Sequence, residues 1–376
     1  MNNALHFSPS TPFTIGVEME LQLVDPKTWD LKPVANEIID LIGKNDPHLK
    51  HELFESMIEI NTDVCRNAHE IEANIHDKLR VLHQHCEKIG VQLASTGTHP
   101  FSRYIDGKVV AAERYQYLID RNRLLAQRLI IFGLHVHLGM RDGEHCIAMT
   151  NLFLNHLYLL LALSASSPFW QGQDTGLASG RSTIFEALPT AGHPNPVRNW
   201  KEFCELYDRL CRCEGIHSLK DIWWDLRPSP HYGTLEIRVC DALATVRETV
   251  ALVALIHALA IACDRQLDKN NLPEPPPLWV IRENKWRASR YGLEAKMIVD
   301  KDGHTSKVPE QLERLLGSLA PIASDLHYRE YFDVLKQLIA SGGNYNRQRL
   351  VYARTQSFPQ VVEANCREFE TDTIRI

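Results

Sequence analysis

Two acidic side chains, Glu18 and Glu20, lie two residues apart in an early segment of alternating character. Over residues 13–23 every odd position is apolar, and every even position is Thr, Gly, Glu or Gln. Because successive side chains of a strand point to opposite faces, this pattern predicts a strand with one apolar and one polar face. The two carboxylates would lie about 7 Å apart on the polar face, where like charges repel. Hard divalent cations prefer such oxygen ligands, so a metal site is one interpretation and a solvated sheet face is the other.

Three later segments repeat the two-faced pattern, over residues 53–62, 134–140 and 233–241. Their polar faces carry, in order, Glu55, Glu59, Asn61, His135, His137, Thr234, Glu236 and Arg238. Taken singly, each segment is also typical of an edge strand, a packed histidine or a weak surface salt bridge. If the four segments pair in one antiparallel sheet, their polar faces line one cavity, and so many charges cannot be buried without counter-ions. We therefore expect two or three Mg²⁺ or Mn²⁺ ions there, together with a polyphosphate.

The sequence contains neither a Gly-x-x-x-x-Gly-Lys-Ser/Thr loop nor a Gly-x-Gly-x-x-Gly turn. A P-loop or Rossmann nucleotide site is therefore excluded. What remains is an ATP site built on the sheet and bridged by metal ions. Residues 164–196, rich in Gly, Pro, Ser and Thr, predict a long irregular lid or binding loop. Arg181 within it is a candidate for holding a substrate carboxylate, because its planar guanidinium suits bidentate recognition.

Composition narrows the class of protein. The chain has 376 residues, a formal net charge of −6 and no basic block, which argues against a nucleic-acid partner. Its longest apolar run, residues 250–263, is too short to span a bilayer and predicts a buried helix. We find no segment typical of a signal peptide. Nine scattered cysteines without a Cys-x-x-Cys pair favour reduced thiols and a cytoplasmic protein.

Helical periodicity separates the strands. It predicts helices over residues 33–44, 67–89, 113–132, 144–163 and 199–212, and through most of the chain after residue 246. A proline-rich connector spans residues 273–277, and Asp302-Gly303 marks a hairpin turn. Strands cluster in the first two-thirds of the chain and helices in the last third, so the predicted fold class is α+β.

With these motifs the chain resembles the glutamate–cysteine ligase type 2 family, also called carboxylate–amine ligases, of the glutamine synthetase-like superfamily. The matching stretches keep the family's order and are residues 13–20, 55–59, 97–100, 113–116, 135–139 and 227–238. The resemblance covers residues 10–300, nearly the whole chain. It implies a single catalytic domain over residues 1–376. It also implies a curved antiparallel sheet whose polar face lines the active site and whose other face is covered by helices.

The resemblance further implies an ATP-dependent ligation. Glutamate's side-chain carboxylate would be phosphorylated and then attacked by the amine of cysteine, giving γ-glutamylcysteine, ADP and phosphate. Magnesium or manganese would assist, and the protein would form a homo-oligomer, with a dimer favoured. By similarity, the metal ligands are Glu18, Glu20, Glu59, His137 and Glu236. The implied catalytic residues are Glu59, Arg227 and Arg238, and the residues that bind ATP or substrate are Arg238, His231, Tyr115 and Arg181.

Three alternatives stay open. The substrates could be a different carboxylate and amine, because side-chain pockets cannot be read from a sequence. His135 and His137 with a carboxylate could instead hold zinc or iron in a hydrolase or oxygenase. The chain could also bind nucleotides without catalysis.

Overall fold

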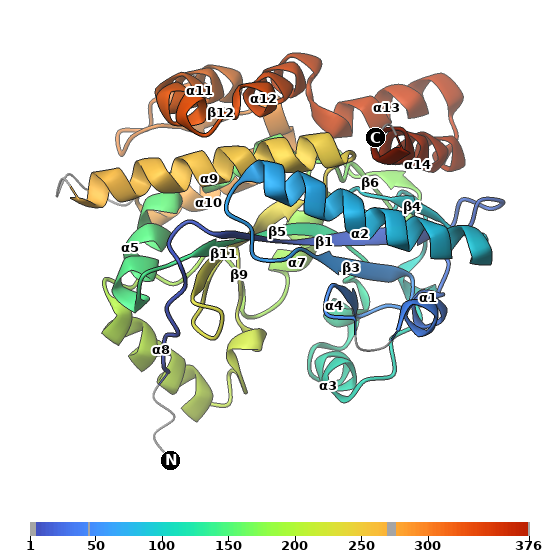
Figure 1. Ribbon diagram of the computed structural model, residues 1–376, viewed down its shortest axis with the longest axis horizontal. Helices are drawn as coiled ribbons and strands as arrows, with labels where there is room; N and C mark the ends of the chain where they lie inside the picture. The colour runs from blue at the N-terminus through green and yellow to red at the C-terminus, as the bar shows by residue number, and fades with distance from the viewer. Residues whose placement is uncertain (1–4, 44–45, 269–275, 375–376) are drawn as a thin grey trace.

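A seven-stranded antiparallel sheet lies at the centre of the protein, here described by a computed structural model (Figure 1). The structure describes residues 5–43, 46–268 and 276–374. The strands follow the order β10-β11-β5-β1-β3-β2, and β4 pairs with the C-terminal end of β1. Their bounds are β1 Ile15–Val24, β2 Leu49–His51, β3 Met57–Asn61, β4 Gln92–Ala94, β5 Gly133–Gly139, β10 Leu226–Ser229 and β11 Thr234–Asp241. The four predicted two-faced segments are therefore neighbours in one sheet, in the order β11-β5-β1-β3.

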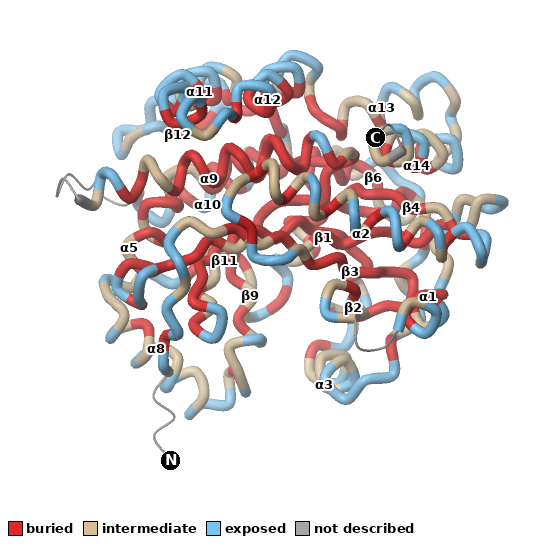
Figure 2. Tube along the Cα trace, viewed as in Figure 1, coloured by how far each residue is buried: buried red, intermediate tan, exposed pale blue. Residues whose placement is uncertain are grey.

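The apolar face of the sheet packs against two long helices, α2 (Ala68–Ile89) and α9 (Val246–Asp268). Both helices run along the same side of the sheet in Figure 1, and the layer that they cover is largely buried in Figure 2. Val17, Met19 and Leu21 of β1 belong to one core cluster that also contains apolar side chains of both helices. The alternation of β1 thus separates a core face from a polar face, and the predicted α+β class is confirmed.

Helix α9 is a long apolar helix of the core. Residues 246–267 are long and apolar enough to cross a membrane, with a mean hydropathy of 1.8. However, 78% of this apolar stretch is buried inside the protein. It is therefore the buried helix that the sequence predicts around residues 250–263. The helices that follow it in the chain are α10 Leu278–Tyr291, α11 Val308–Asp325, α12 Arg329–Ser341, α13 Gly343–Thr355 and α14 Phe358–Ile374. Residues 273–275 of the predicted connector lie outside the described residues.

Two predicted helices are each divided in two. The helix expected over residues 113–132 forms α3 (Glu113–Asn122) and α4 (Leu124–Gln127), and the one over 144–163 forms α5 (Gly143–Phe153) and α6 (Leu157–Ser164). An asparagine lies at each break, with its side-chain amide bonded to the carbonyl of a residue three or four positions earlier. Such bonds compete with the helical backbone pattern, which periodicity alone does not reveal.

The segment over residues 164–196 is more ordered than its composition predicts. It contains a short hairpin of β6 (Phe169–Trp170) and β7 (Gln173–Asp174), the helix α7 (Gly180–Glu186) and the strand β8 (Ala191–Gly192). The other elements are α1 Ala35–Ile42, α8 Trp200–Arg212, β9 Trp223–Trp224, β12 Lys296–Ile298 and β13 Thr305–Lys307, with three short 3₁₀ turns. The predicted hairpin around residues 302–303 is β12–β13.

The core face of β1 gives a test of this arrangement. Leu21 is fully buried between the sheet and the helices. We expect Leu21→Ala to lower the free energy of unfolding by about 2–5 kcal/mol, because it removes apolar contacts and leaves a cavity. Leu41→Ala is the control, since Leu41 is 50% exposed and its truncation should have little effect. Equal losses for the two variants in denaturant unfolding would contradict the assigned faces.

Candidate active site

Strand register brings the predicted acidic and imidazole side chains onto one face of the sheet. The register pairs on this face are Glu18 with His135, Glu20 with Glu59, and His137 with Glu236. Paired residues of antiparallel strands have Cβ atoms about 4.5–5.5 Å apart, so the ends of these side chains can meet above the sheet. The convergence expected from the alternating patterns is therefore present in the structure.

Within the part of the chain that the structure describes, three groups of side chains offer possible metal ligands. In each group the ligand atoms lie within 4.8 Å of one another. The groups are Glu18 with Glu59 and His135, Glu18 with His137 and Glu236, and Glu20 with Glu52 and Glu59. Carboxylate oxygens, which are most of these donors, are the ligands that Mg²⁺ and Mn²⁺ prefer, and a shared carboxylate can bridge neighbouring ions. The donor set therefore fits the two or three divalent ions expected from the sequence.

The two histidines are oriented by neighbouring side chains. His137 Nδ1 lies 2.9 Å from Thr234 Oγ1, which turns Nε2 towards Glu18 Oε1 at 3.3 Å. His135 Nδ1 lies 3.2 Å from Glu18 Oε2. Burial, with the nearby charge of Arg238, lowers the pKa of His135, so its neutral form is favoured. The neutral imidazole has the lone pair that a metal ligand requires.

Carboxylates repel one another at the β1–β3 end of the face. Burial and the charges of Glu18 and Glu52 raise the pKa of Glu59 well above its usual value. Burial and the charge of Glu20 likewise raise the pKa of Glu52 to about 7. Protons thus relieve part of the repulsion when no cation is bound, and a divalent ion would replace them.

Glu236 lies fully buried between two arginines at the other end of the face. Arg227 donates from Nε to Oε2 at 2.8 Å and from Nη2 to Oε1 at 3.0 Å, and Arg238 donates to Oε1 through Nη1. Although burial opposes it, these two positive charges hold the pKa of Glu236 below its usual value. A carboxylate has about four lone-pair positions, so three hydrogen bonds still leave one for a metal ion. A register shift between Ile237 and Cys240 places Arg238 at a β-bulge, a device that re-aims side chains next to functional sites.

A cavity of about 640 Å³ opens over this face. The sheet forms its polar wall, and apolar side chains form part of the opposite wall, namely Tyr115, Leu118, Leu129, Ile131, Phe185 and Trp223. Tyr115 Oη donates to the carbonyl of His51 at 2.7 Å, so its hydroxyl hydrogen is already used within the wall. His231 is exposed and lies at the rim, in the turn between β10 and β11. The cavity thus contains the predicted nucleotide- and substrate-binding residues Tyr115, Arg181, His231 and Arg238, whose roles stay predictions.

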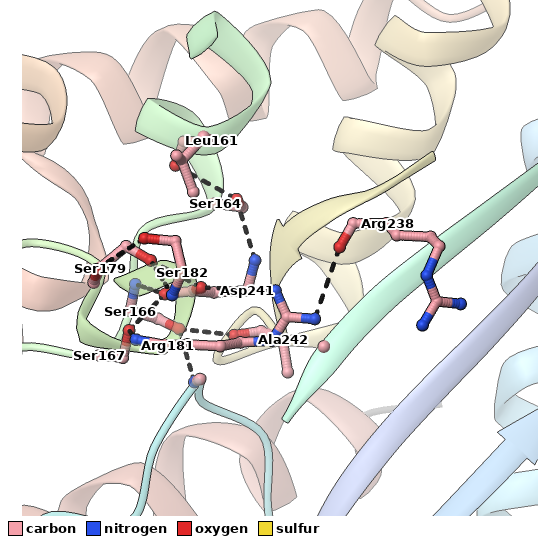
Figure 3. A network of polar contacts seen from close by, with 12 residues as sticks. Leu161, Ser164, Ser166, Ser167, Ser179, Arg181, Ser182, Arg238, Asp241 and Ala242 are labelled. Atoms are coloured by element: carbon pink, nitrogen blue, oxygen red, sulfur yellow. Dashed lines mark hydrogen bonds and ion pairs between the residues drawn. The ribbon is translucent and has the colours of Figure 1, made fainter. Parts of the chain in front are cut away.

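Arg181 reaches the cavity from the first turn of α7. Its side chain is 3% exposed, and Nη2 lies 3.5 Å from the carbonyl oxygen of Arg238 (Figure 3). The ring of Phe185 lies 5.7 Å from the guanidinium carbon. Arg181 comes from the segment predicted as a binding loop, and the structure brings it beside the strand that carries Glu236.

One prediction about this face is wrong, and one residue was missed. Glu55 precedes β3 instead of lying within it, and its Oε2 pairs with Lys108 Nζ at 2.6 Å away from the cavity. Strand β3 begins only at Met57, so the alternation assumed from residue 53 does not hold. Glu52 joins the acidic group instead, from the non-repetitive segment before the strand. Periodicity carries no signal for such a position. The one signal in the sequence was an additional acidic residue a few positions before Glu59.

Two curated relatives and one solved structure are similar to this chain over nearly its whole length. A chain from Bdellovibrio bacteriovorus named "Putative glutamate–cysteine ligase 2" is 46% identical over 366 residues, covering 97% of both chains. A chain of the same name from Thermobifida fusca is 40% identical over 370 residues, covering 97% of this chain and 93% of that one. The solved structure of a glutamate–cysteine ligase from Francisella tularensis, in complex with AMP, covers 99% of this chain and 91% of that one. Its TM-score is 0.72 at 11% identity, which shows a shared fold.

The chain therefore shares its overall fold with a solved glutamate–cysteine ligase. The chain itself belongs to the glutamate–cysteine ligase family 2, whose model matches residues 14–368. The resemblance drawn from the sequence motifs is confirmed.

The acidic end of the face predicts a pH-dependent response to magnesium. The folded protein retains a proton on Glu52 up to about pH 7, whereas the unfolded chain loses it near the ordinary Glu value. Metal-free stability should therefore fall as pH rises towards 7, and Mg²⁺ should raise the melting temperature more at pH 8 than at pH 6. Thermal melts with and without Mg²⁺ measure both effects. Glu52→Gln should weaken the pH dependence and the exposed Glu113→Gln should keep it; the same response from both would contradict the assignment.

The arginine pair predicts a second effect. Glu236→Gln leaves two largely buried guanidinium groups without their shared, fully buried counter-ion, so the free energy of unfolding should fall by about 3–5 kcal/mol. Glu202 forms an ion pair with the exposed Arg198, so Glu202→Gln should change the free energy of unfolding little. Denaturant unfolding without metal or nucleotide compares the variants, and a Glu236→Gln protein as stable as wild type would exclude the tight ion-pair arrangement.

Proposed function

We propose that this protein is an ATP-dependent carboxylate–amine ligase that joins glutamate to cysteine. The single observation that carries the proposal is the convergence of three possible metal-ligand groups and two largely buried arginines on one cavity. Phosphoryl transfer needs positioning and charge neutralisation more than covalent help, and this arrangement provides both. Family membership and the names of the relatives supply the substrates in the proposal.

The reaction has two steps. An oxygen of the glutamate side-chain carboxylate attacks the γ-phosphorus of ATP, and ADP leaves with the electron pair of the broken P–O bond. The resulting acyl phosphate is attacked at its carbonyl carbon by the amine nitrogen of cysteine. A C–N bond forms, phosphate leaves, and the amine loses one proton, which gives γ-glutamylcysteine.

The residues of the site divide into those that bind metal cations and those that bind anionic groups of the substrates. In the proposal, Glu18, Glu20, Glu52, Glu59, His135, His137 and Glu236 hold Mg²⁺ or Mn²⁺ ions, which would neutralise phosphate charge. Arg227 and Arg238 then orient phosphate oxygens from β10 and β11, with His231 at the rim. Arg181 holds a carboxylate of the amino-acid substrate, and Tyr115 forms part of its wall.

The geometry favours this reading over a zinc or iron enzyme. A site with two histidines and one carboxylate needs both imidazoles on one ion. Among the described residues, His135 and His137 fall in different ligand groups. The larger number of carboxylates also favours Mg²⁺ or Mn²⁺.

Three further expectations belong to the proposal. One catalytic domain spans the chain, since the matched residues run through almost all of it. The protein works in the cytoplasm, in keeping with nine free cysteines. It forms a homodimer, which light scattering on the purified protein can test.

Trapping with hydroxylamine tests the ligase chemistry separately from the acceptor. With ATP, Mg²⁺ and glutamate, hydroxylamine should capture the acyl phosphate as a hydroxamate, and cysteine should then stimulate ADP release. Hydroxamate without stimulation by cysteine, but with stimulation by another amine, would retain the ligase and change its acceptor. ATP binding without hydroxamate or ADP release for any carboxylate would favour a non-catalytic nucleotide-binding protein.

Glu59→Gln provides the matched variant. Because its raised pKa favours a protonated Glu59 in the metal-free protein, glutamine mimics that form and should preserve the fold. Hydroxamate formation should fall by on the order of 10²-fold, because a metal ligand is lost. Thermal melting without metal checks the fold, and near wild-type turnover at low Mg²⁺ would count against Glu59 as a ligand.

A further inference from the structure

Asp241, at the end of β11, is fully buried and lies three residues beyond Arg238. One oxygen, Oδ2, accepts a hydrogen bond from the backbone N–H of Ser166 at 3.0 Å and another from Ser167 Oγ at 2.6 Å. The other oxygen, Oδ1, accepts from Ser179 Oγ at 2.8 Å. Figure 3 shows these groups gathered around the carboxylate. Three hydrogen bonds thus fix the orientation of Asp241.

The same serines hold the start of the helix that carries Arg181. Ser167 Oγ accepts from the backbone N–H of Arg181 at 3.0 Å while it donates to Asp241. Ser179 Oγ caps α7 by accepting from the backbone N–H of Ser182 at 3.4 Å. Asp241 is therefore joined by two hydroxyl relays to the first turn of α7, so the position of this turn depends on the aspartate.

The guanidinium of Arg181 is placed without using all its donors. Nη1 lies 3.9 Å from Asp241 Oδ1, which is too long for a hydrogen bond but close enough for charge balance. Among the described residues, none accepts a hydrogen bond from Nε. A buried cation with spare donors that lines a cavity is suited to an anionic group of a ligand.

Gly133 makes room for this placement. A Cβ atom there would lie 2.2 Å from Arg181 Nη2, so a side chain at this position would displace the guanidinium. The N–H of Gly133 donates to Glu20 Oε2, which belongs to one of the possible metal-ligand groups. Arg181 is thus held next to the acidic end of the face as well as next to β11.

We propose that Asp241 is a positioning residue, which holds Arg181 in the orientation that binds the carboxylate substrate. This inference rests on the proposed function and deepens it. Asp241 supplies the negative charge that a buried guanidinium requires. Because the distance from Asp241 Oδ1 to Arg181 Nη1 is too long for a hydrogen bond, N–H groups of Arg181 stay available for the substrate. The serine hydroxyls fix the position of the carboxylate relative to the first turn of α7.

Asp241→Asn tests the role through the substrate dependence of hydroxamate formation. The variant keeps the size of the side chain but removes its charge, and it replaces one hydrogen-bond acceptor of the carboxylate by a donor. KM for glutamate should rise by on the order of 10- to 100-fold, because a small misplacement of a binding group is costly, whereas KM for ATP should stay within about twofold. Ser182→Ala is the matched control: in the same turn of α7 it removes a buried hydroxyl that bonds Ser179 O and Ser289 Oγ of α10, but it touches neither charged group.

Chemical rescue separates positioning from folding of the loop. Added guanidinium ion should restore part of the activity of Arg181→Ala, because Asp241 still offers its charge beside the vacated space. It should restore none in the double variant Arg181→Ala, Asp241→Asn. Thermal melting of each variant checks that the protein is folded.

The outcomes separate the inference from the proposed function. Wild-type hydroxamate formation with an unchanged glutamate KM in Asp241→Asn would overturn the inference alone, as would equal rescue of the single and double variants. A selective rise in KM for glutamate, with rescue that needs Asp241, would establish it. A wild-type protein that forms no hydroxamate with any carboxylate would overturn both.

Discussion

One constraint governs the rest of the structure: side chains of like charge are held close together on one face of the sheet. Glu20 lies directly opposite Glu59, Glu52 lies close to both, and Glu18 lies close to Glu59. Like charges at such positions destabilise a sheet, yet the core behind them holds the strands in this register. A one-residue slip would turn the acidic side chains into that core and its apolar residues outward. The apolar face therefore supplies the stability with which the acidic face is maintained.

Much of this arrangement could be predicted because the alternation of a strand is local information. Residues 13–23 determine which side of β1 is polar, whatever else the chain does. Strands β5 and β11 were predicted on the same grounds, with Glu236 and Arg238 on one face. Where the chain leaves that period, prediction failed: Glu55 was placed on the face, and Glu52, which lies before the strand, was overlooked.

Contacts distant in sequence were not predictable for a different reason. Asp241 accepts hydrogen bonds from serines more than 60 positions earlier, and no periodic pattern marks those serines. The irregular composition of residues 164–196 indicated a loop, but composition does not show that buried hydroxyls would order it. The division of the predicted helices at Asn122 and Asn155 is similar, because apolar spacing carries no signal for the side-chain bonds to the backbone that lie at each break.

The two ends of the charged face differ in how their negative charge is balanced. At the β11 end, Arg227 and Arg238 already neutralise Glu236 and hold its pKa low. At the β1–β3 end, no comparable pair relieves Glu52 and Glu59 among the described residues, and both pKa values are raised. Cations should therefore bind most favourably at the β1–β3 end, and anionic oxygens should bind most favourably beside the arginines of the β11 end. A charged face with this polarity is suited to a ligand that brings divalent cations to one end of the sheet and anionic oxygens to the other.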